Sequence, residues 1–138
     1  MTAKKVLIDT GPLVAMLRSA DEHHGACVEQ ARSLARPAFT CWPVITEAAY
    51  LLRHSVAGRR GLTAWLKNGE NELLPLSADD VPGIEGVLEK YSDQGVDLAD
   101  AALVHLADRE GIGTVFTLDR RDFSVYRQSD GKAFELLP

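Results

Sequence analysis

The sequence predicts an α/β domain in which a mostly parallel sheet of about five strands is covered by helices on both faces. Short apolar segments typical of buried strands alternate with longer segments whose apolar residues recur at helical spacing. Strands joined through helices pair in parallel, because each helix carries the chain back to the starting edge of the sheet. A chain of 138 residues is long enough for one core and too short for a second independent one. We therefore expect a single domain over residues 1–138.

Five segments are predicted to be strands because apolar residues gather in them between turn-forming or polar residues. They cover residues 4–9, 38–42, 73–76, 113–118 and 132–137. The first strand ends at Asp9, and Pro12 follows it closely. Proline suits the first turn of a helix, so a helix is expected to begin there.

Six segments are predicted to be helices. They cover residues 12–18, 22–35, 43–57, 61–68, 77–91 and 97–110. The third has one apolar face, formed by Ile45, Ala48, Ala49, Leu52 and Val56. Gly58 is expected to end this helix and Gly111 to end the sixth. Ser77 and Asp80 have the spacing of a capping box, which predicts the start of the fifth.

The charge of the chain argues against a general nucleic-acid binder. The net charge is −5, with nine Lys/Arg and five Asp/Glu in residues 1–69 but six and fifteen in residues 70–138. An acidic protein binds nucleic acid only where a basic patch or a metal ion reverses the local sign.

No apolar run approaches the ~18 residues of a membrane span, and the N-terminus resembles a strand more than a signal peptide. We expect a cytoplasmic protein with no membrane contact.

Five acidic residues are predicted to converge at the carboxyl edge of the sheet. Asp9 and Asp119 directly follow strands, Glu47 lies early in the helix after the second strand, and Asp97 and Asp100 begin a helix. In open parallel sheets the functional crevice lies beyond the carboxyl ends of the strands. These side chains are therefore candidates for one shared site.

A divalent cation would relieve the repulsion among such carboxylates. Mg²⁺ and Mn²⁺ prefer oxygen ligands, and a bound ion activates water for phosphodiester hydrolysis. Structural explanations exist for single members of the set. Asp97 suits a helix N-cap, Glu47 suits a helix start, and Asp119 suits a turn. Asp9 is hardest to explain structurally, because a carboxylate that ends an apolar strand is costly to bury.

Four separated segments together resemble the PIN-domain family, and in particular its small ribonuclease toxins of the VapC type. The segments are VLIDTGPLVAML (6–17), WPVITEAAYLL (42–52), DLADAALVHLA (97–107) and TVFTLDRRDFSVYR (114–127). The resemblance implies a three-layer α/β/α fold. It also implies a catalytic and metal-binding set at Asp9, Glu47, Asp100 and Asp119. Asp97 matches a neighbouring acidic position, Thr10 a polar residue after the first aspartate, and Thr117 a residue that supports the water shell of the metal.

The same resemblance implies an endoribonuclease that depends on Mg²⁺ or Mn²⁺, forms a homodimer and is inhibited by a cognate antitoxin. Two other classes remain open. One is a non-catalytic module that binds RNA or protein. The other is a metal-dependent phosphatase, which is disfavoured because no second aspartate lies two positions after Asp9.

Two further sets of side chains have less specific interpretations. Arginines that follow the last acid contact RNA phosphates, or they are simply solvated or paired to Asp122. They are Arg120, Arg121 and Arg127, and a second basic patch is formed by Arg53, Arg59 and Arg60. Trp42 and Trp65 are expected in the core. Alternatively, Leu62, Trp65 and Leu66 form an apolar surface for a partner.

Overall fold

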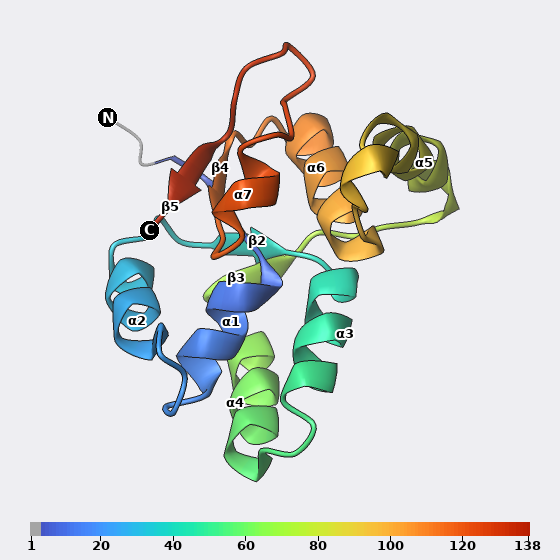
Figure 1. The fold of residues 1–138 in the computed structure, drawn as a ribbon. Coiled ribbons are helices and arrows are strands. Elements are labelled where there is room, and N and C mark those ends of the chain that lie inside the picture. The colour runs from blue at the N-terminus through green and yellow to red at the C-terminus, as the bar shows by residue number, and fades with distance from the viewer. Residues whose placement is uncertain (1–3) are drawn as a thin grey trace.

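A computed structural model describes residues 4–138 and contains a five-stranded sheet at its centre (Figure 1). All neighbouring strands are parallel, in the order β3-β2-β1-β4-β5. The strands are β1 (Val6–Ile8), β2 (Ala38–Thr40), β3 (Asn71–Leu73), β4 (Thr114–Phe116) and β5 (Glu135–Leu137). The prediction of an α/β domain with about five parallel strands is confirmed, although each strand is shorter than expected.

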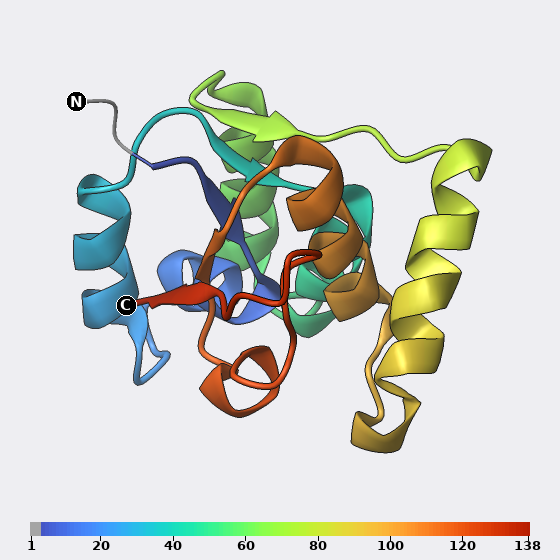
Figure 2. The ribbon, with the colours of Figure 1, turned by 90° about the horizontal axis from the view of Figure 1, so that it is seen from above.

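Seven helices connect the strands. They are α1 (Thr10–Leu17), α2 (His24–Arg32), α3 (Trp42–Leu51), α4 (Val56–Lys67), α5 (Val81–Lys90), α6 (Leu98–Glu110) and α7 (Arg120–Phe123). The chain runs outward from β1 to β3, then returns to β4 and continues to β5. Since crossover connections are right-handed, this reversal places α1–α4 and α5–α7 on opposite faces, which gives three layers. Figures 1 and 2 show α2 and α5 at opposite ends of the molecule.

The core lies between the sheet and the helices that cover it. Leu7 and Phe116 on the central strands are fully buried, as is Leu52 after α3. Helix α6 is buried along most of its length and has alanines where it meets its neighbours. A helix that is apolar around most of its circumference must be enclosed by other elements. This enclosure fixes α6, and with it Asp97 and Asp100, relative to the central strands.

The predicted helix over residues 43–57 is wrong, because the chain forms two helices there. Helix α3 ends at Leu51, and the Ser55 hydroxyl accepts a hydrogen bond from the Gly58 amide to begin α4. Gly58 therefore lies in the first turn of α4 and does not end a helix. A Cβ at Gly58 would come within 2.8 Å of Leu52 Cδ2. Glycine thus allows α4 to pack closely on the turn that separates the two helices.

Other local signals acted as predicted. Ser77 and Asp80 form the expected capping box, which opens a 3₁₀ turn (Ala78–Asp80) ahead of α5. Gly111 ends α6 with a φ of 68°, the left-handed conformation that glycine adopts without strain. Helix α7 was not predicted, since it has only four residues. None of the helices within residues 4–138 is both long and apolar enough to span a membrane.

Candidate active site

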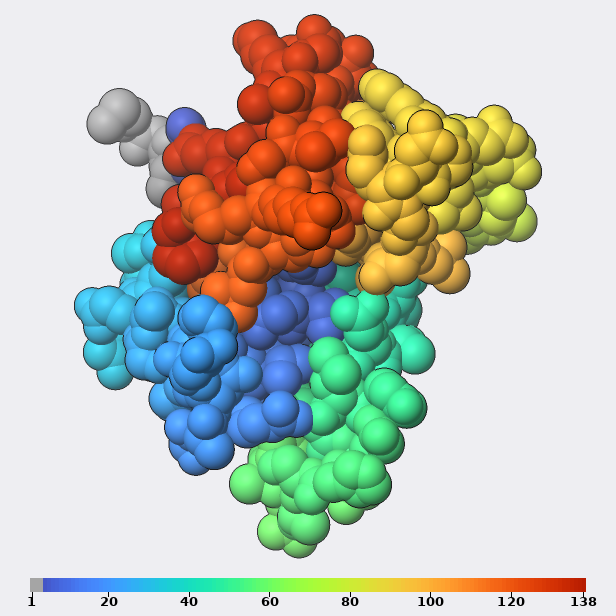
Figure 3. Space-filling view, viewed as in Figure 1, coloured from blue at the N-terminus to red at the C-terminus, as the bar shows by residue number. Residues whose placement is uncertain are grey.

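Six carboxylates line one cleft at the carboxyl edge of the sheet. The cleft has a volume of about 450 Å³ and contains all five predicted acids together with Asp122. The six residues are Asp9, Glu47, Asp97, Asp100, Asp119 and Asp122. They come from segments far apart in the chain. Figure 3 shows the corresponding contact on the surface, where the orange C-terminal segment lies against the blue start of the chain. The predicted convergence at one edge is confirmed by this geometry.

Helix starts position three of these acids. Asp9 caps α1, Asp97 caps α6 and Asp119 caps α7, each through a side-chain oxygen that accepts a backbone amide. A helix N-terminus attracts negative charge through its free amides and its dipole. The structural explanation of Asp97 as a helix cap therefore holds together with its place in the cleft, and Asp119, which was expected in a turn, is a helix cap as well. Capping fixes Asp9 and Asp119 where a strand passes into a helix, and it fixes Asp97 at the start of α6.

Asp9 is the most constrained of the acids. Only 6% of the residue is exposed. Its Oδ1 accepts the Thr10 amide at 2.8 Å, and its Oδ2 accepts the Thr117 hydroxyl at 2.7 Å. Burial raises the pKa of Asp9 to about 6, with smaller contributions from the charges of Glu47 and Asp119, although both hydrogen bonds oppose the rise. The anion is therefore costly in this position without a cation.

Asp100 lines the same cleft, and burial penalises its charged form as it does that of Asp9. Burial raises the pKa of Asp100 to about 8, and the charges of Asp9 and Asp97 add to the rise. A hydrogen bond from the Tyr126 hydroxyl to Asp100 Oδ2, at 3.0 Å, opposes it. Two buried acids with raised pKa values in one cleft are typical of a functional site.

The pKa of Glu47 is also raised, first by burial and then by the charge of Asp97. The Thr10 hydroxyl faces Glu47 and partly offsets this rise. The contact does not have ordinary hydrogen-bond geometry. Among the buried side-chain oxygens of residues 4–138, only the Thr10 hydroxyl oxygen has no hydrogen-bond partner. A buried hydroxyl without a partner beside three carboxylates fits a site that is completed by water or an ion.

Asp122 is a site residue that the sequence analysis assigned only to pairing with arginines. One oxygen each of Asp100, Asp119 and Asp122 lies within 4.8 Å of the other two. Burial and the neighbouring Asp119 raise the pKa of Asp122. Its position three residues after Asp119, in the first turn of α7, is the signal that would have identified it.

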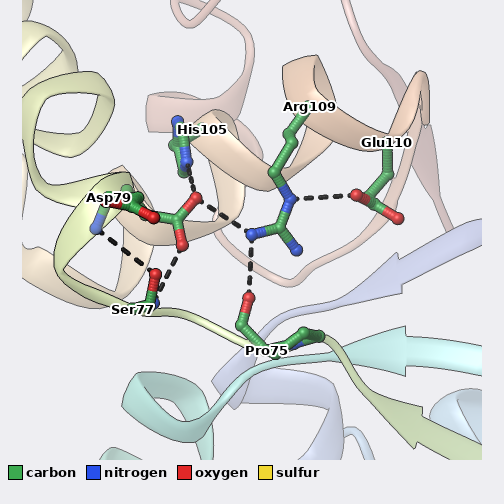
Figure 4. A network of polar contacts seen from close by, with 7 residues as sticks. Pro75, Ser77, Asp79, His105, Arg109 and Glu110 are labelled. Carbon is green, nitrogen blue, oxygen red and sulfur yellow. Dashed lines mark hydrogen bonds and ion pairs between the residues drawn. The ribbon is translucent and has the colours of Figure 1, made fainter.

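None of the six carboxylates forms an ion pair with a Lys, Arg or His side chain in the described part of the chain. Another buried aspartate shows the contrast (Figure 4). Asp80 contacts His105 Nε2 at 2.8 Å and Arg109 at 2.9 Å, and these hydrogen bonds lower its pKa well below the usual range. The fold thus supplies cationic partners to a structural acid but none to the acids of the cleft. A set of hard oxygen donors without protein cations fits Mg²⁺ or Mn²⁺.

The predicted arginine contacts with Asp122 are absent from residues 4–138. Arg120 donates to the Pro138 carbonyl at 2.7 Å, and Arg127 donates to the Ser124 carbonyl at 2.6 Å. Arg53 lies over the ring of Tyr50, 3.9 Å from its centroid. Within the described residues, none of these three guanidinium groups lines the cleft or pairs with one of its acids.

The alternative of an apolar partner surface at Leu62, Trp65 and Leu66 is wrong. Leu62 is buried, and Trp65 and Leu66 pack against the core. Trp42, predicted in the core, is instead 58% exposed. It lines a shallow apolar hollow together with Tyr50 and Leu98, and Glu47 and Asp97 border both this hollow and the acidic cleft.

The chain is thus a three-layer α/β/α domain with a cluster of carboxylates at the carboxyl edge of its parallel sheet. A model of the PIN domain matches residues 6–128, and the chain belongs to this family. It is 35% identical to Ribonuclease VapC26 of Mycobacterium tuberculosis over 135 residues, which cover 96% of this chain and 100% of that protein.

Solved structures of the same fold include two from VapC systems. VapC20 of Mycobacterium tuberculosis, a toxin that cleaves the sarcin-ricin loop, has a TM-score of 0.77 and 17% identity over 84% of this chain and 91% of its own. VapBC2 of Rickettsia felis, bound to a DNA fragment from its promoter, has a TM-score of 0.64 and 14% identity over 96% of both chains. At these identities the two structures establish the fold alone.

Proposed function

We propose that this protein is a divalent-metal-dependent endoribonuclease and the toxin of a toxin–antitoxin pair, acting as a single domain over residues 1–138. The observation that carries this proposal is the acidic cleft, in which no carboxylate has a protein cation as partner within residues 4–138. Its 35% identical relative is named a ribonuclease, which supports the same reaction class.

Asp9, Asp100 and Asp119 would anchor the metal ion, and Glu47 and Asp97 would complete or orient its ligand shell. A bound Mg²⁺ or Mn²⁺ supplies an activated water and offsets negative charge on the phosphodiester. Thr117 holds Asp9 in place, since its hydroxyl donates to Asp9 Oδ2. Its oxygen also accepts the Asp119 amide at 2.9 Å, which ties two ligand positions together. Two of the proposed ligands, Asp9 and Asp119, are thus held in place relative to each other before an ion binds.

RNA is the proposed substrate. The acidic cleft repels phosphates until a cation reverses its sign, so binding and cleavage should both depend on the metal. Arg120 and Arg121, which are exposed and directly follow Asp119, would then contact phosphates outside the cleft. This arrangement accounts for nuclease chemistry in a chain of net charge −5.

A nuclease assay with purified protein and a structured RNA tests the proposal. We expect cleavage with Mn²⁺ or Mg²⁺, none in EDTA, and none from Asp9→Asn. The variant should keep its far-UV circular dichroism spectrum, because asparagine preserves the shape of the side chain. Full cleavage in EDTA or by Asp9→Asn would refute a metal-dependent mechanism. Binding of RNA without cleavage under all metal conditions would instead favour a non-catalytic module.

The partners follow from the same proposal. The toxin would be held inactive in the cytoplasm by a cognate antitoxin, encoded beside it as a small DNA-binding protein. One structural neighbour is a VapBC assembly bound to promoter DNA, which supports this arrangement. We also propose a homodimer that buries the apolar hollow of Trp42, Tyr50 and Leu98. These side chains are 58%, 61% and 58% exposed, and clustered exposed aromatics are typical of protein interfaces.

A further inference from the structure

Tyr126 is a fully buried residue whose hydroxyl contacts an acid of the cleft from inside the core. Its side chain is 0% exposed and does not line the cleft. The hydroxyl donates a hydrogen bond to Asp100 Oδ2 at 3.0 Å. A buried tyrosine requires a hydrogen-bond partner for its hydroxyl. An ionised carboxylate is the strongest acceptor for such a neutral donor.

Two aromatic rings fix the position of this hydroxyl. The Tyr91 ring packs edge-to-face against Tyr126 with centroids 4.9 Å apart, and the Phe123 ring does so at 5.0 Å. Phe123 directly follows Asp122 in α7, so the same turn that carries two acids also positions the tyrosine. Close packing on two sides restricts the ring, and the oxygen is held at a defined point relative to α6.

Asp100 depends on this single contact. Within residues 4–138, the Tyr126 hydroxyl is the one donor to its side-chain oxygens, and Oδ1 accepts no hydrogen bond. Asp9, in contrast, accepts one donor on each oxygen. Rotation of the Asp100 carboxylate is therefore limited by one hydroxyl, while Asp9, Asp97 and Asp119 repel it from the cleft side.

We propose that Tyr126 is a positioning residue of the metal site. Its hydroxyl engages Asp100 Oδ2 and thereby holds the carboxylate in the orientation that leaves Oδ1 for a divalent cation. This inference rests on the proposed function, because it requires Asp100 to be a metal ligand. Hydrogen-bond partners of metal ligands typically contribute about 10- to 100-fold to metal affinity.

Tyr126→Phe removes the hydroxyl and keeps the ring that packs between Tyr91 and Phe123. We expect the Kd for Mn²⁺, measured by isothermal titration calorimetry, to rise about tenfold. The far-UV circular dichroism spectrum should not change. In an RNA cleavage assay, the loss of rate should be large at limiting Mn²⁺ and small at saturating Mn²⁺, which separates a metal-binding defect from a general one.

Tyr91→Phe is the matched control. Tyr91 is also buried and belongs to the same aromatic cluster, but its hydroxyl accepts the Arg127 amide at 2.8 Å and touches no carboxylate. Removing it leaves that amide without its partner, so the thermal unfolding midpoint should fall while the Kd for Mn²⁺ stays unchanged.

An unchanged Kd for Mn²⁺ in Tyr126→Phe overturns the positioning role and leaves the proposed function standing. Equal weakening in both tyrosine variants also overturns it, because a general loss of packing would then explain the effect. A wild-type protein that binds no Mn²⁺ overturns both the positioning role and the metal-dependent function.

Discussion

The Thr117 hydroxyl donates to Asp9 Oδ2 at 2.7 Å, across 108 positions of sequence. Both residues are buried, and they follow β4 and β1, which are neighbouring strands of the sheet. The hydroxyl oxygen also accepts the Asp119 amide. One small side chain thus joins two acids of the cleft, which is a more direct role than support of a water shell.

Thr117→Val should impair metal binding more than folding. Valine fills the same volume, but Asp9 loses a donor and the Asp119 amide loses its acceptor. We expect an affinity for Mn²⁺ that is about 10- to 100-fold weaker, measured by calorimetry.

The corresponding control is Thr40→Val, since Thr40 is an equally buried threonine whose hydroxyl donates to the Ile8 carbonyl at 2.9 Å. That variant should lose about 1 kcal/mol of stability and keep the Mn²⁺ affinity of the wild type. Equal metal affinities for the two variants would contradict the role of Thr117.

The metal-free protein should become less stable as pH rises from about 4 to about 8. Burial raises the pKa of Asp9 to about 6 and of Asp100 to about 8, above the unfolded value of 3.8. The native state therefore binds more protons than the unfolded state in this range, and the free energy of unfolding falls with pH. The loss is on the order of a few kcal/mol. Thermal unfolding in EDTA at a series of pH values measures it.

Saturating Mn²⁺ is the control for this pH dependence. A bound cation stabilises the charged carboxylates, so the decline between pH 5 and pH 8 should be largely removed. If stability in EDTA does not change with pH, the pKa values of the buried acids are not raised in the folded protein. A profile that falls equally with and without Mn²⁺ would show that the ion does not bind at these acids.

Asp100→Asn should stabilise the metal-free protein at pH 8 while it abolishes cleavage. The amide has no charge to desolvate or to be repelled by Asp9 and Asp97, and its oxygen still accepts the Tyr126 hydroxyl. We expect a higher unfolding midpoint than the wild type in EDTA at pH 8. The difference should vanish near pH 3, where the wild-type acid is mostly protonated in both states, since its pKa is 3.8 when unfolded and about 8 when folded. A variant that is less stable than the wild type at both pH values would refute this explanation.

The features of the fold that depend on local signals were predictable from the sequence. Asp9 and Asp119 could be assigned to one edge because each follows an apolar strand, and parallel strands place their carboxyl ends together. The capping box of Ser77 and the left-handed Gly111 also act through neighbours within a few residues. Such signals do not depend on which distant segment packs nearby.

Features that depend on distant segments were not predictable. Tyr126 lies 26 residues from Asp100 in a segment with no regular periodicity, so nothing in the sequence linked its hydroxyl to the cleft. The break between α3 and α4 was concealed because Leu52 and Val56 continue the apolar spacing, although Ser55 caps a new helix and Val56 is 55% exposed. Trp42 was assigned to the core from its residue type, although the first turn of α3 leaves it exposed.

The exposed hollow gives a test of the proposed homodimer. Trp42→Ser and Leu98→Ser each replace an apolar side chain that is 58% exposed by a polar one. If a second copy covers this surface, burial of apolar area supplies much of the association free energy, and either change should shift the protein toward monomer. Sedimentation velocity over a range of concentrations measures the shift. Val81→Ser is the control, because Val81 is 57% exposed on α5 and lies outside the hollow. A wild-type monomer at high concentration, or dimers that dissociate equally in all three variants, would exclude this interface.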